Sequence, residues 1–600
     1  MAKKLSDMDD DFLLEDEEEE SEGLEKKKIN LKGIIITVLL IGIVTCVAIF
    51  CIKTVFKDFK LGGSDKASTK HVDLKTVFEV KEGSYPLIID GALSEYRAYE
   101  MDGQLYLNRR IVASEIDCRF YYDELNDRVL YTTEDTTYTF APDSKEYVDS
   151  EGNKTSLSYA PIKENANGIY IALDFINFKR TMFTYSVYEE PKRIDLWTYE
   201  MEQQFDNYKI KSSTALRNGD SIKNDILADI KKDEYLTVLE DSEDEYVKVI
   251  YHGIEGYVKK KCVEKDSSKE GLFVINPEFK RTRMNDKVSL GWVQVTTAAA
   301  NSTVLDYAKA ASGVNVISPT WYQVENTSGD LVTFVDDDIV ANLHRMGYKV
   351  WPLVSDFVID VNSKELLSKA DSRANIINKL MADAKKYGYE GINIDFEHVK
   401  EESSEDFLQF IRELSVECRK AGIILSADTY VPMSHTEFYN RGEQGKVIDY
   451  VIVMAYDEHW AGAPESGSVA SLPFVENGIK NTILQVKDPS KVIVALPFYT
   501  RIWAEDSTSG TVKITSKAYG IKSVMDTINA NTTEKVWLSE EAQYYAQYKV
   551  GDVLYKCWIE DSASMEEKLR VAKNNNLAGY AFWRLGLENA EIYDVINKYR

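Results

Sequence analysis

The chain has 600 residues, and at roughly 150 residues per domain this length predicts several domains and excludes a single small module. Hydrophobic residues make up 44% of the sequence and charged residues 28%, which excludes a wholly disordered or collagen-like protein. The formal net charge of −27 argues against a general nucleic-acid-binding protein, because phosphate contacts need a cationic face.

Residues 1–32 form an acidic tail. Residues 9–11 are all Asp, and residues 15–20 are all Asp or Glu. A block of like charges cannot bury apolar area, so we expect this tail to be disordered and solvated.

An apolar run follows the tail, beginning at Gly33 and ending at Val55, with no charged side chain before Lys53. About 20 apolar residues cross the hydrocarbon core of a bilayer, so residues 33–55 are predicted to form one transmembrane helix in contact with lipid. The alternative is a buried core helix. A long acidic leader is not typical of a cleaved signal peptide and favours an uncleaved anchor. Lysines flank the run on both sides and give only a mild preference for a cytoplasmic amino terminus.

Residues 56–77 are polar and predict a linker, and residues 78–200 predict short strands with an internal repeat. The repeated motifs are G-Q-L-Y-L, F-Y-Y-D and R-V-L-Y at 103–107, 120–123 and 128–131, then G-I-Y-I-A-L, F-T-Y and R-I-D-L-W at 168–173, 183–185 and 193–197. This duplication resembles a stalk module known as the copper amine oxidase amino-terminal-like domain. The name implies neither copper nor oxidase activity.

Residues 205–266 predict a small barrel of short strands at 213–217, 235–240, 246–251 and 256–258. The pattern resembles a bacterial SH3-like domain. Such domains bind cell-wall peptide or act as spacers, and both interpretations remain open.

Residues 285–600 alternate apolar strands with helices. The predicted strands are 288–295, 314–318, 350–354, 391–396, 423–427, 451–454, 492–496 and 579–583, and amphipathic helices are clearest at 365–388 and 403–421. Eight buried strands alternating with helices predict a (β/α)8 TIM barrel, in which chemistry lies where the strands end. The predicted class is therefore α/β, with this barrel preceded by small β-rich modules and one transmembrane helix.

The fourth predicted strand carries polar residues on one face. Asn393, Asp395 and Glu397 alternate with Ile394 and Phe396, so the three polar side chains point one way. A solvated edge strand is the alternative, but helices flank the segment in sequence and predict burial. Inward carboxylates are costly unless they are paired or functional, which favours a functional site.

The octapeptide E-G-I-N-I-D-F-E at 390–397 resembles the DGxDxDxE signature of glycoside hydrolase family 18, the chitinase and N-acetylglucosaminidase family. The G-I-N-I-D-F-E form is similar to that of the spore-cortex and cell-wall N-acetylglucosaminidases. Three further motifs support the resemblance over residues 285–600: M-A-Y-D at 454–457 on the sixth strand, L-P-F-Y at 496–499 with Arg501 on the seventh, and F-W-R-L-G at 582–586 on the eighth.

The resemblance implies substrate-assisted retaining hydrolysis, in which the 2-acetamido oxygen of the sugar acts as the nucleophile. Glu397, last on the strand, is the candidate acid beside the leaving oxygen. Asp395 would orient the acetamido group and stabilise the oxazolinium ion. The middle aspartate of the family is Asn393 here, and the first is Glu390. An amide cannot share a proton with Asp395 as a carboxylate would.

The remaining candidate residues would bind the substrate. Tyr456 would donate a hydrogen bond to the acetamido oxygen, Asp457 would help bind the reacting sugar, and Trp583 would form an apolar floor. Tyr499 and Arg501 could line the cleft or belong to the barrel core. The full candidate set of substrate-binding residues is Asn393, Met454, Tyr456, Asp457, Tyr499, Arg501 and Trp583.

The chemistry implied by the resemblance needs no metal or cofactor. His398 and His459 are too isolated to suggest a metal site, and the six cysteines lack the CxxC spacing of a zinc knuckle.

We therefore expect a single-pass protein of the cell membrane with an extracellular catalytic domain that cleaves N-acetylglucosamine-containing glycan, above all peptidoglycan. A catalytically silent, lectin-like wall protein and a chitinase are the alternatives.

Overall fold

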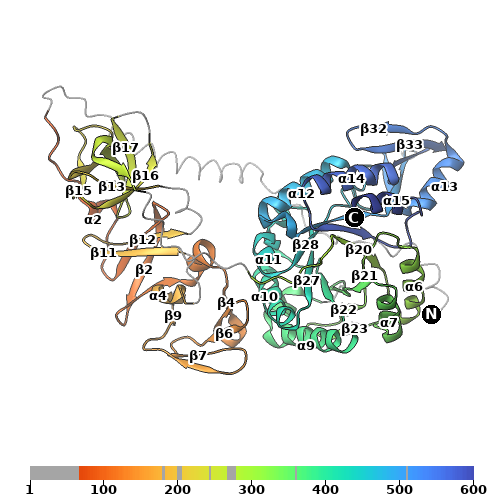
Figure 1. The fold of residues 1–600 in the computed structure, drawn as a ribbon, viewed down its shortest axis with the longest axis horizontal. Coiled ribbons are helices and arrows are strands. Elements are labelled where there is room, and N and C mark those ends of the chain that lie inside the picture. Colours follow the sequence, from red (N-terminus) through yellow and green to blue (C-terminus); the bar gives the residue numbers. More distant parts are fainter. Residues whose placement is uncertain are drawn as a thin grey trace. The chain divides into compact units, whose positions relative to one another are not determined.

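The computed structural model describes residues 66–178, 183–198, 206–241, 245–266, 279–358, 361–507 and 511–600 (Figure 1). The described residues form two compact units, one containing 101–178 and 279–600 and the other containing 66–100 and 183–266, with the gaps given above. The predicted acidic tail and the predicted span at 33–55 lie outside the described residues. Within the part of the chain that the structure describes, no helix combines the length and the apolar character needed to cross a membrane.

The carboxy-terminal part is a closed parallel barrel, as predicted. Its strands are β20 (Val288–Val293), β21 (Val316–Pro319), β24 (Lys349–Val350), β25 (Leu353–Ser355), β26 (Gly391–Asp395), β27 (Ile424–Tyr430), β28 (Tyr450–Met454), β29 (Val492–Pro497) and β35 (Gly579–Trp583). β24 and β25 are two parts of the third strand, and β35 pairs in parallel with both β29 and β20, which closes the sheet. A short hairpin, β22 (Tyr322–Val324) and β23 (Leu331–Thr333), extends the second strand.

Helices surround the strands (Figure 1). They are α6 (Asn301–Ala310), α7 (Asp337–Arg345), α8 (Ser363–Ser368), α9 (Ala370–Tyr387), α10 (Ser404–Ala421), α11 (Arg441–Val447), α12 (Leu472–Val486), α14 (Ser562–Asn574) and α15 (Ile592–Tyr599). The helix predicted at 365–388 is divided into α8 and α9, because Lys369 between them has extended backbone. α10 matches the prediction and ends at Gly422, whose φ of +68° suits glycine.

Two apolar layers fill the barrel domain. The outer layer lies between strands and helices, where Phe396 stacks on Phe407 and Phe410 of α10 with ring centroids 5.9 and 5.5 Å away. The inner layer fills the barrel and includes Trp292 and Trp351. The interior is therefore a packed core, and polar groups at the strand ends stand on an apolar floor.

A small antiparallel sheet is inserted after the seventh barrel strand. It comprises β30 (Tyr499–Asp506), β31 (Lys513–Gly520), β32 (Val536–Leu538), β33 (Gln543–Val550) and β34 (Val553–Ile559), with helix α13 (Ile521–Asn531). Ile502, Val524, Ile528 and Cys557 share its buried core. The sequence analysis did not predict this sheet.

Residues 101–178 form a β-rich module in the same unit as the barrel. It contains β3 (Gln104–Asn108), α3 (Arg109–Ile111), β4 (Phe120–Asp123), β5 (Arg128–Thr132), β6 (Thr137–Phe140), β7 (Glu146–Val148), β8 (Lys154–Ser156), β9 (Ile162–Asn165), β10 (Gly168–Ala172) and α4 (Leu173–Ile176). β4 to β8 form one antiparallel sheet, and Phe140, Phe175 and Phe178 pack edge to face or stack beside it.

This module contacts the outer face of α10 through polar groups. The Tyr121 hydroxyl donates to Asp406 Oδ1 at 2.5 Å, and Gln409 Nε2 donates to Thr132 Oγ1 at 3.0 Å. Arg412 donates to the backbone oxygen of Cys118 at 3.2 Å. α10 is therefore buried on both sides, by apolar contacts toward the barrel and by polar contacts toward the module.

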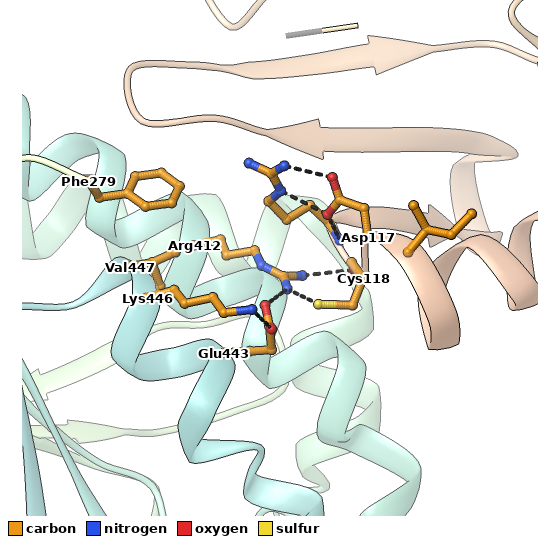
Figure 2. Close-up of a pocket in the computed structure, with 9 residues that line it drawn as sticks. Asp117, Cys118, Phe279, Arg412, Glu443, Lys446 and Val447 are labelled. Carbon is orange, nitrogen blue, oxygen red and sulfur yellow. Dashed lines mark hydrogen bonds and ion pairs between the residues drawn. The ribbon is translucent and has the colours of Figure 1, made fainter. Parts of the chain in front are cut away.

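A cavity of about 40 Å³ lies at this contact (Figure 2). Burial raises the pKa of the Cys118 thiol to about 12, and Arg412 Nη2 lies 2.9 Å from its sulfur. Figure 2 shows Arg412 reaching across the contact to Cys118, with Glu443 beside its guanidinium. The lining residues are Ile116, Asp117, Cys118, Arg119, Phe279, Arg412, Glu443, Lys446 and Val447. None of these is a predicted site residue, so the cavity is separate from the predicted chemistry.

The second unit contains the remaining β structure. Its elements are α2 (Leu74–Val77), β1 (Ser84–Ile89), β2 (Ala92–Met101), β11 (Phe183–Glu189), β12 (Lys192–Thr198), β13 (Asp206–Ile210), β14 (Thr214–Arg217), β15 (Ile226–Ile230), β16 (Tyr235–Glu240), β17 (Tyr246–Tyr251), β18 (Ile254–Lys259) and β19 (Val263–Lys265). β13 to β19 form one antiparallel sheet, and the four strands predicted there are present. The likeness to an SH3 domain remains a prediction.

The sequence repeat corresponds to a repeated order of elements. β3 is followed by a helix and the hairpin β4–β5, and β10 is followed by a helix and the hairpin β11–β12. β3 and β10 pair with each other in antiparallel fashion. The predicted 78–200 module is divided between the two units, and its likeness to a named stalk domain remains a prediction.

Candidate active site

The polar residues of β26 lie at its carboxyl end, as the alternation predicts. Asn393 and Asp395 are 0% and 4% exposed, whereas Ile392 and Ile394 belong to the outer apolar layer. Glu397 lies two residues beyond the strand and is half-buried. The two carboxylates therefore share the inward side of the strand, and the one farther along the chain is the more accessible.

Asn393 is held on both sides of its amide. Trp292 Nε1 donates to its Oδ1 at 2.8 Å. Its Nδ2 donates to Asp428 Oδ1 at 2.8 Å and to Ser426 Oγ at 3.2 Å. This side chain is fully buried beneath the site, where its amide holds Asp428. Its role in binding the substrate remains a prediction.

Asp428 on β27 stands beside Asp395. The register pairs Asn393 with Ser426 and Ile394 with Ala427, which brings Asp395 level with Asp428 on the neighbouring strand. Burial raises the pKa of both carboxyls well above the usual range, and the nearby Glu397 charge raises both further. Asp395 Oδ1 has no hydrogen-bond partner among the described residues. Burial and like charge thus both favour the protonated form in this pair.

Glu397 is fixed by a phenol and by the turn in which it lies. The Tyr430 hydroxyl donates to Glu397 Oε2 at 2.5 Å. The backbone N–H of Glu397 donates to Asp356 Oδ1 at 2.8 Å, and that of His398 donates to Asp356 Oδ2 at 3.1 Å. Burial raises the pKa of Asp356 to about 7. Asp356, directly after β25, thus orients the turn that carries the candidate acid.

Tyr456 follows β28 and faces the same carboxylates. Burial raises the pKa of its phenol, and the charges of Asp395 and Glu397 raise it further. Met454, the last residue of β28, is 7% exposed. A neutral phenol near two carboxyls is suited to donate a hydrogen bond to a ligand oxygen.

Tyr499, Asp457 and Arg501 form the side of the site near the inserted sheet. The Tyr499 hydroxyl donates to Asp457 Oδ1 at 2.7 Å. Burial is the largest cause of the raised pKa of this phenol, and the charge of Asp457 raises it further. Arg501 is 3% exposed, and its Nη1 donates to Ser516 Oγ at 3.2 Å. Its Nε and Nη2 have no partner among the described residues, so this guanidinium retains donors for an acceptor.

Trp583 lies at the end of β35, the eighth barrel strand. Its ring is half-buried and packs against the inner layer, with its centroid 5.8 Å from that of Trp292 at an interplanar angle of 62°. Trp292 also holds Asn393. The indole therefore caps the apolar interior close to the β26 residues.

Three residues of this arrangement were missed by the sequence analysis: Asp356, Asp428 and Tyr430. Each lies at or just after the end of a parallel strand, in S-D after β25 or in A-D-T-Y of β27. Polar residues at the carboxyl ends of barrel strands are the signal that could have found them. Within the described ranges, no group of three or more His, Cys, Asp or Glu side chains is arranged to hold a metal ion.

The family model described as glycosyl hydrolases family 18 matches residues 360–588, which include β26 to β35 and nearly all of this site. This segment is a family 18 glycosyl hydrolase domain. The family 18 domain is thus a glycosidase domain, and its matched range contains all the predicted site residues.

Individual relatives match the same part of the chain. YdhD of Bacillus subtilis, which carries the name of a sporulation-specific glycosylase, is 30% identical over 237 residues, 37% of this chain and 53% of YdhD. The match thus spans about half the length of that relative. The cortical fragment-lytic enzyme of Bacillus anthracis is 23% identical over 315 residues, 50% of this chain and 71% of that protein.

Among solved structures, the spore cortex-lytic enzyme SleL of Bacillus cereus aligns with a TM-score of 0.47 and 19% identity, over 52% of this chain and 74% of that chain.

Proposed function

We propose that this protein hydrolyses glycans containing N-acetylglucosamine, with peptidoglycan as the substrate, by substrate-assisted retaining catalysis. The observation that carries the proposal is that Asp395 ends β26 at the carboxyl end of the barrel and Glu397 follows two residues later, where Tyr430 holds it. The names of two relatives, a cortical fragment-lytic enzyme and a sporulation-specific glycosylase, support a wall glycan over other N-acetylated polymers.

In this mechanism Glu397 donates a proton to the leaving glycosidic oxygen while the acetamido oxygen attacks the anomeric carbon. Asp395 accepts a hydrogen bond from the acetamido N–H and stabilises the positive charge of the oxazolinium ion. Tyr456 donates to the acetamido oxygen, and Trp583 supports the sugar ring from below. Glu397 then deprotonates a water molecule, which attacks the anomeric carbon and opens the oxazolinium ring. The product keeps the anomeric configuration of the substrate.

We also propose that the family 18 domain lies outside the cell and is anchored to the membrane by a single span at residues 33–55. Peptidoglycan lies outside the membrane, so an anchored enzyme would remain near its substrate. The apolar run and the charge pattern of the sequence support this location. Protease treatment of intact cells tests it, because only an external domain is cleaved without lysis.

The activity is tested by incubating the full-length protein with purified peptidoglycan and, separately, with chitin, followed by mass spectrometry of the products. We expect new N-acetylglucosamine reducing ends from peptidoglycan. Glu397→Gln should lower the rate by about 10²-fold or more while leaving the fold and glycan binding intact.

Undiminished turnover by Glu397→Gln would contradict the assignment of the acid. Binding of peptidoglycan by the wild-type protein with no new reducing ends would indicate a lectin-like protein. Faster cleavage of chitin than of peptidoglycan would indicate a chitinase.

A further inference from the structure

The carboxylate that the family pattern has at position 393 is replaced by an amide, and another carboxylate lies one strand away. Asp428 is 3% exposed and level with Asp395 across the β26–β27 pairing. Both side chains point to the inward face of the barrel, since Asp428 bonds to Asn393 and Asn393 bonds to Trp292. Asp395 thus has a carboxyl neighbour on β27 in place of one on its own strand.

The Asn393–Asp428 hydrogen bond joins a neutral amide to a carboxyl. The amide nitrogen donates and Asp428 Oδ1 accepts at 2.8 Å, while the amide oxygen is taken by Trp292 Nε1. Exchanging the two side chains, with Asp at 393 and Asn at 428, would keep both hydrogen bonds. Only the bond between residues 393 and 428 would change direction, with residue 428 as the donor. The arrangement is therefore chemically symmetrical with respect to the position of the carboxylate.

We propose that Asp428 is the proton-sharing partner of Asp395, so that the pair holds a single proton and releases Asp395 as the anion when positive charge develops on the substrate. This inference deepens the proposed function and rests on it. The step moves one proton, which leaves the Asp395 carboxyl and is taken up by the Asp428 carboxylate, and the total charge of the pair stays at −1. Asp428 is a positioning residue, since it acts through Asp395.

Burial and like charge support one shared proton. Desolvation is the largest cause of the raised pKa of each carboxyl, and the Asp428 charge further raises that of Asp395. The ionisable groups that interact with the pair in the described structure include the carboxyls of Asp356 and Glu397 and the phenols of Tyr430, Tyr439 and Tyr456. All of these are acids, so ionising both members of the pair is strongly disfavoured.

The first test is Asp428→Asn in the full-length protein, assayed on the glycan that the wild-type enzyme cleaves. We expect kcat to fall roughly 10²-fold with KM nearly unchanged. The alkaline limb of the rate profile should move to lower pH by about one unit or more, because removing a buried negative charge lets the remaining carboxyls ionise earlier. Thr429→Val is the matched control, since Thr429 is the adjacent residue of β27 and is 1% exposed.

The decisive variant is the exchange, Asn393→Asp with Asp428→Asn. It restores a carboxylate next to Asp395 and keeps the Trp292 and inter-strand hydrogen bonds. We expect it to recover at least tenfold of the kcat lost in Asp428→Asn and to return the alkaline limb toward its wild-type position. A merely structural role of Asp428 would not be rescued in this way.

Two results would overturn the proposal: an unshifted pH profile in Asp428→Asn, or an exchange variant that is folded by circular dichroism yet no more active than Asp428→Asn. If the wild-type protein cleaves no glycan, the proposed function fails. The pair is then examined without substrate by carboxyl carbon NMR titration, where separate titrations of Asp395 and Asp428, unaffected by each other's replacement, would refute proton sharing.

Discussion

At the scale of single residues, the site depends on where each carboxyl stands relative to water. Asp356, Asp395 and Asp428 are all at most 4% exposed, and burial is the largest cause of the raised pKa of each. Glu397 alone of the four is half-buried. The buried carboxyls therefore form the floor of the site, while Glu397, the proposed proton donor, is more accessible to a ligand.

Asp356 gives this floor a measurable pH dependence of stability. Its pKa is about 7 in the folded protein against 3.8 ordinarily, so the folded state keeps a proton that the unfolded state has already lost. Its contribution to stability is full below about pH 4 and is lost as the pH rises through 7. We expect Asp356→Asn to abolish this loss, so that its stability relative to wild type rises by about a few kcal/mol between pH 4 and 7.5.

Urea unfolding of both proteins across this range checks the expectation. Asp306→Asn is the control, because the Asp306 side chain is 73% exposed. Stability curves of wild type and Asp356→Asn that run parallel over the whole range would contradict the assignment.

The sequence predicted part of this floor. Alternation along residues 391–397 correctly separates the inward Asn393 and Asp395 from the outward Ile394. Asp428 and Tyr430 were missed because they reach the site through the register between β26 and β27, a contact between distant segments that no local pattern contains.

At the scale of elements, a buried ion pair ties the inserted sheet to the barrel. Glu560, just after β34, accepts hydrogen bonds from Lys568 of α14, from Ser564 Oγ at 2.8 Å and from Gln543 at the start of β33. The side chains of Glu560 and Lys568 are both 0% exposed. A buried charge left without its partner is strongly destabilising.

We therefore expect Lys568→Met to lower the free energy of unfolding by about 3–5 kcal/mol. The double variant Glu560→Leu, Lys568→Met removes both charges and should recover much of this loss. Thermal and urea unfolding measure both effects, and a double variant no more stable than the single one would contradict the ion-pair explanation.

Two strands of the inserted sheet, β31 and β33, have few buried positions, which weakens the sequence signal for them. β31 has no fully buried residue, and only two of the eight residues of β33 are buried. Hydrophobic alternation is the main sequence signal for a strand, and it is weak where most side chains face water.

At the scale of the whole molecule, the catalytic unit is larger than a barrel, because the 101–178 module packs on α10. The sequence predicted the apolar face of α10 correctly. It gave no sign that Asp406, Gln409 and Arg412 would also be buried, at 3%, 0% and 2% exposure. Polar residues on the outer side of a helix ordinarily predict contact with solvent, and only the tertiary structure shows their partners.

Arg412 provides the test of this contact. Arg412→Ala removes the hydrogen bonds to Cys118 and should lower the stability of the unit by about 1–3 kcal/mol. Hydrogen exchange should increase in β4 and β5 of the module, with little change at β26. Lys522→Ala on α13 is the control, because the Lys522 side chain is 76% exposed and pairs with Asp526 of the same helix. Unchanged exchange in the module would contradict a role for Arg412 in docking.

The chemical character of the α10 contact has a consequence for assembly. The hydrogen bonds across it join a phenol to a carboxylate, an amide to a threonine hydroxyl and a guanidinium to a backbone oxygen. Water can also satisfy these groups. A barrel and a β-rich module made as separate polypeptides would thus each expose these polar groups, which disfavours aggregation through this surface. The fraction of the two polypeptides that associates would then rise with their concentration and fall as added salt screens the charged groups.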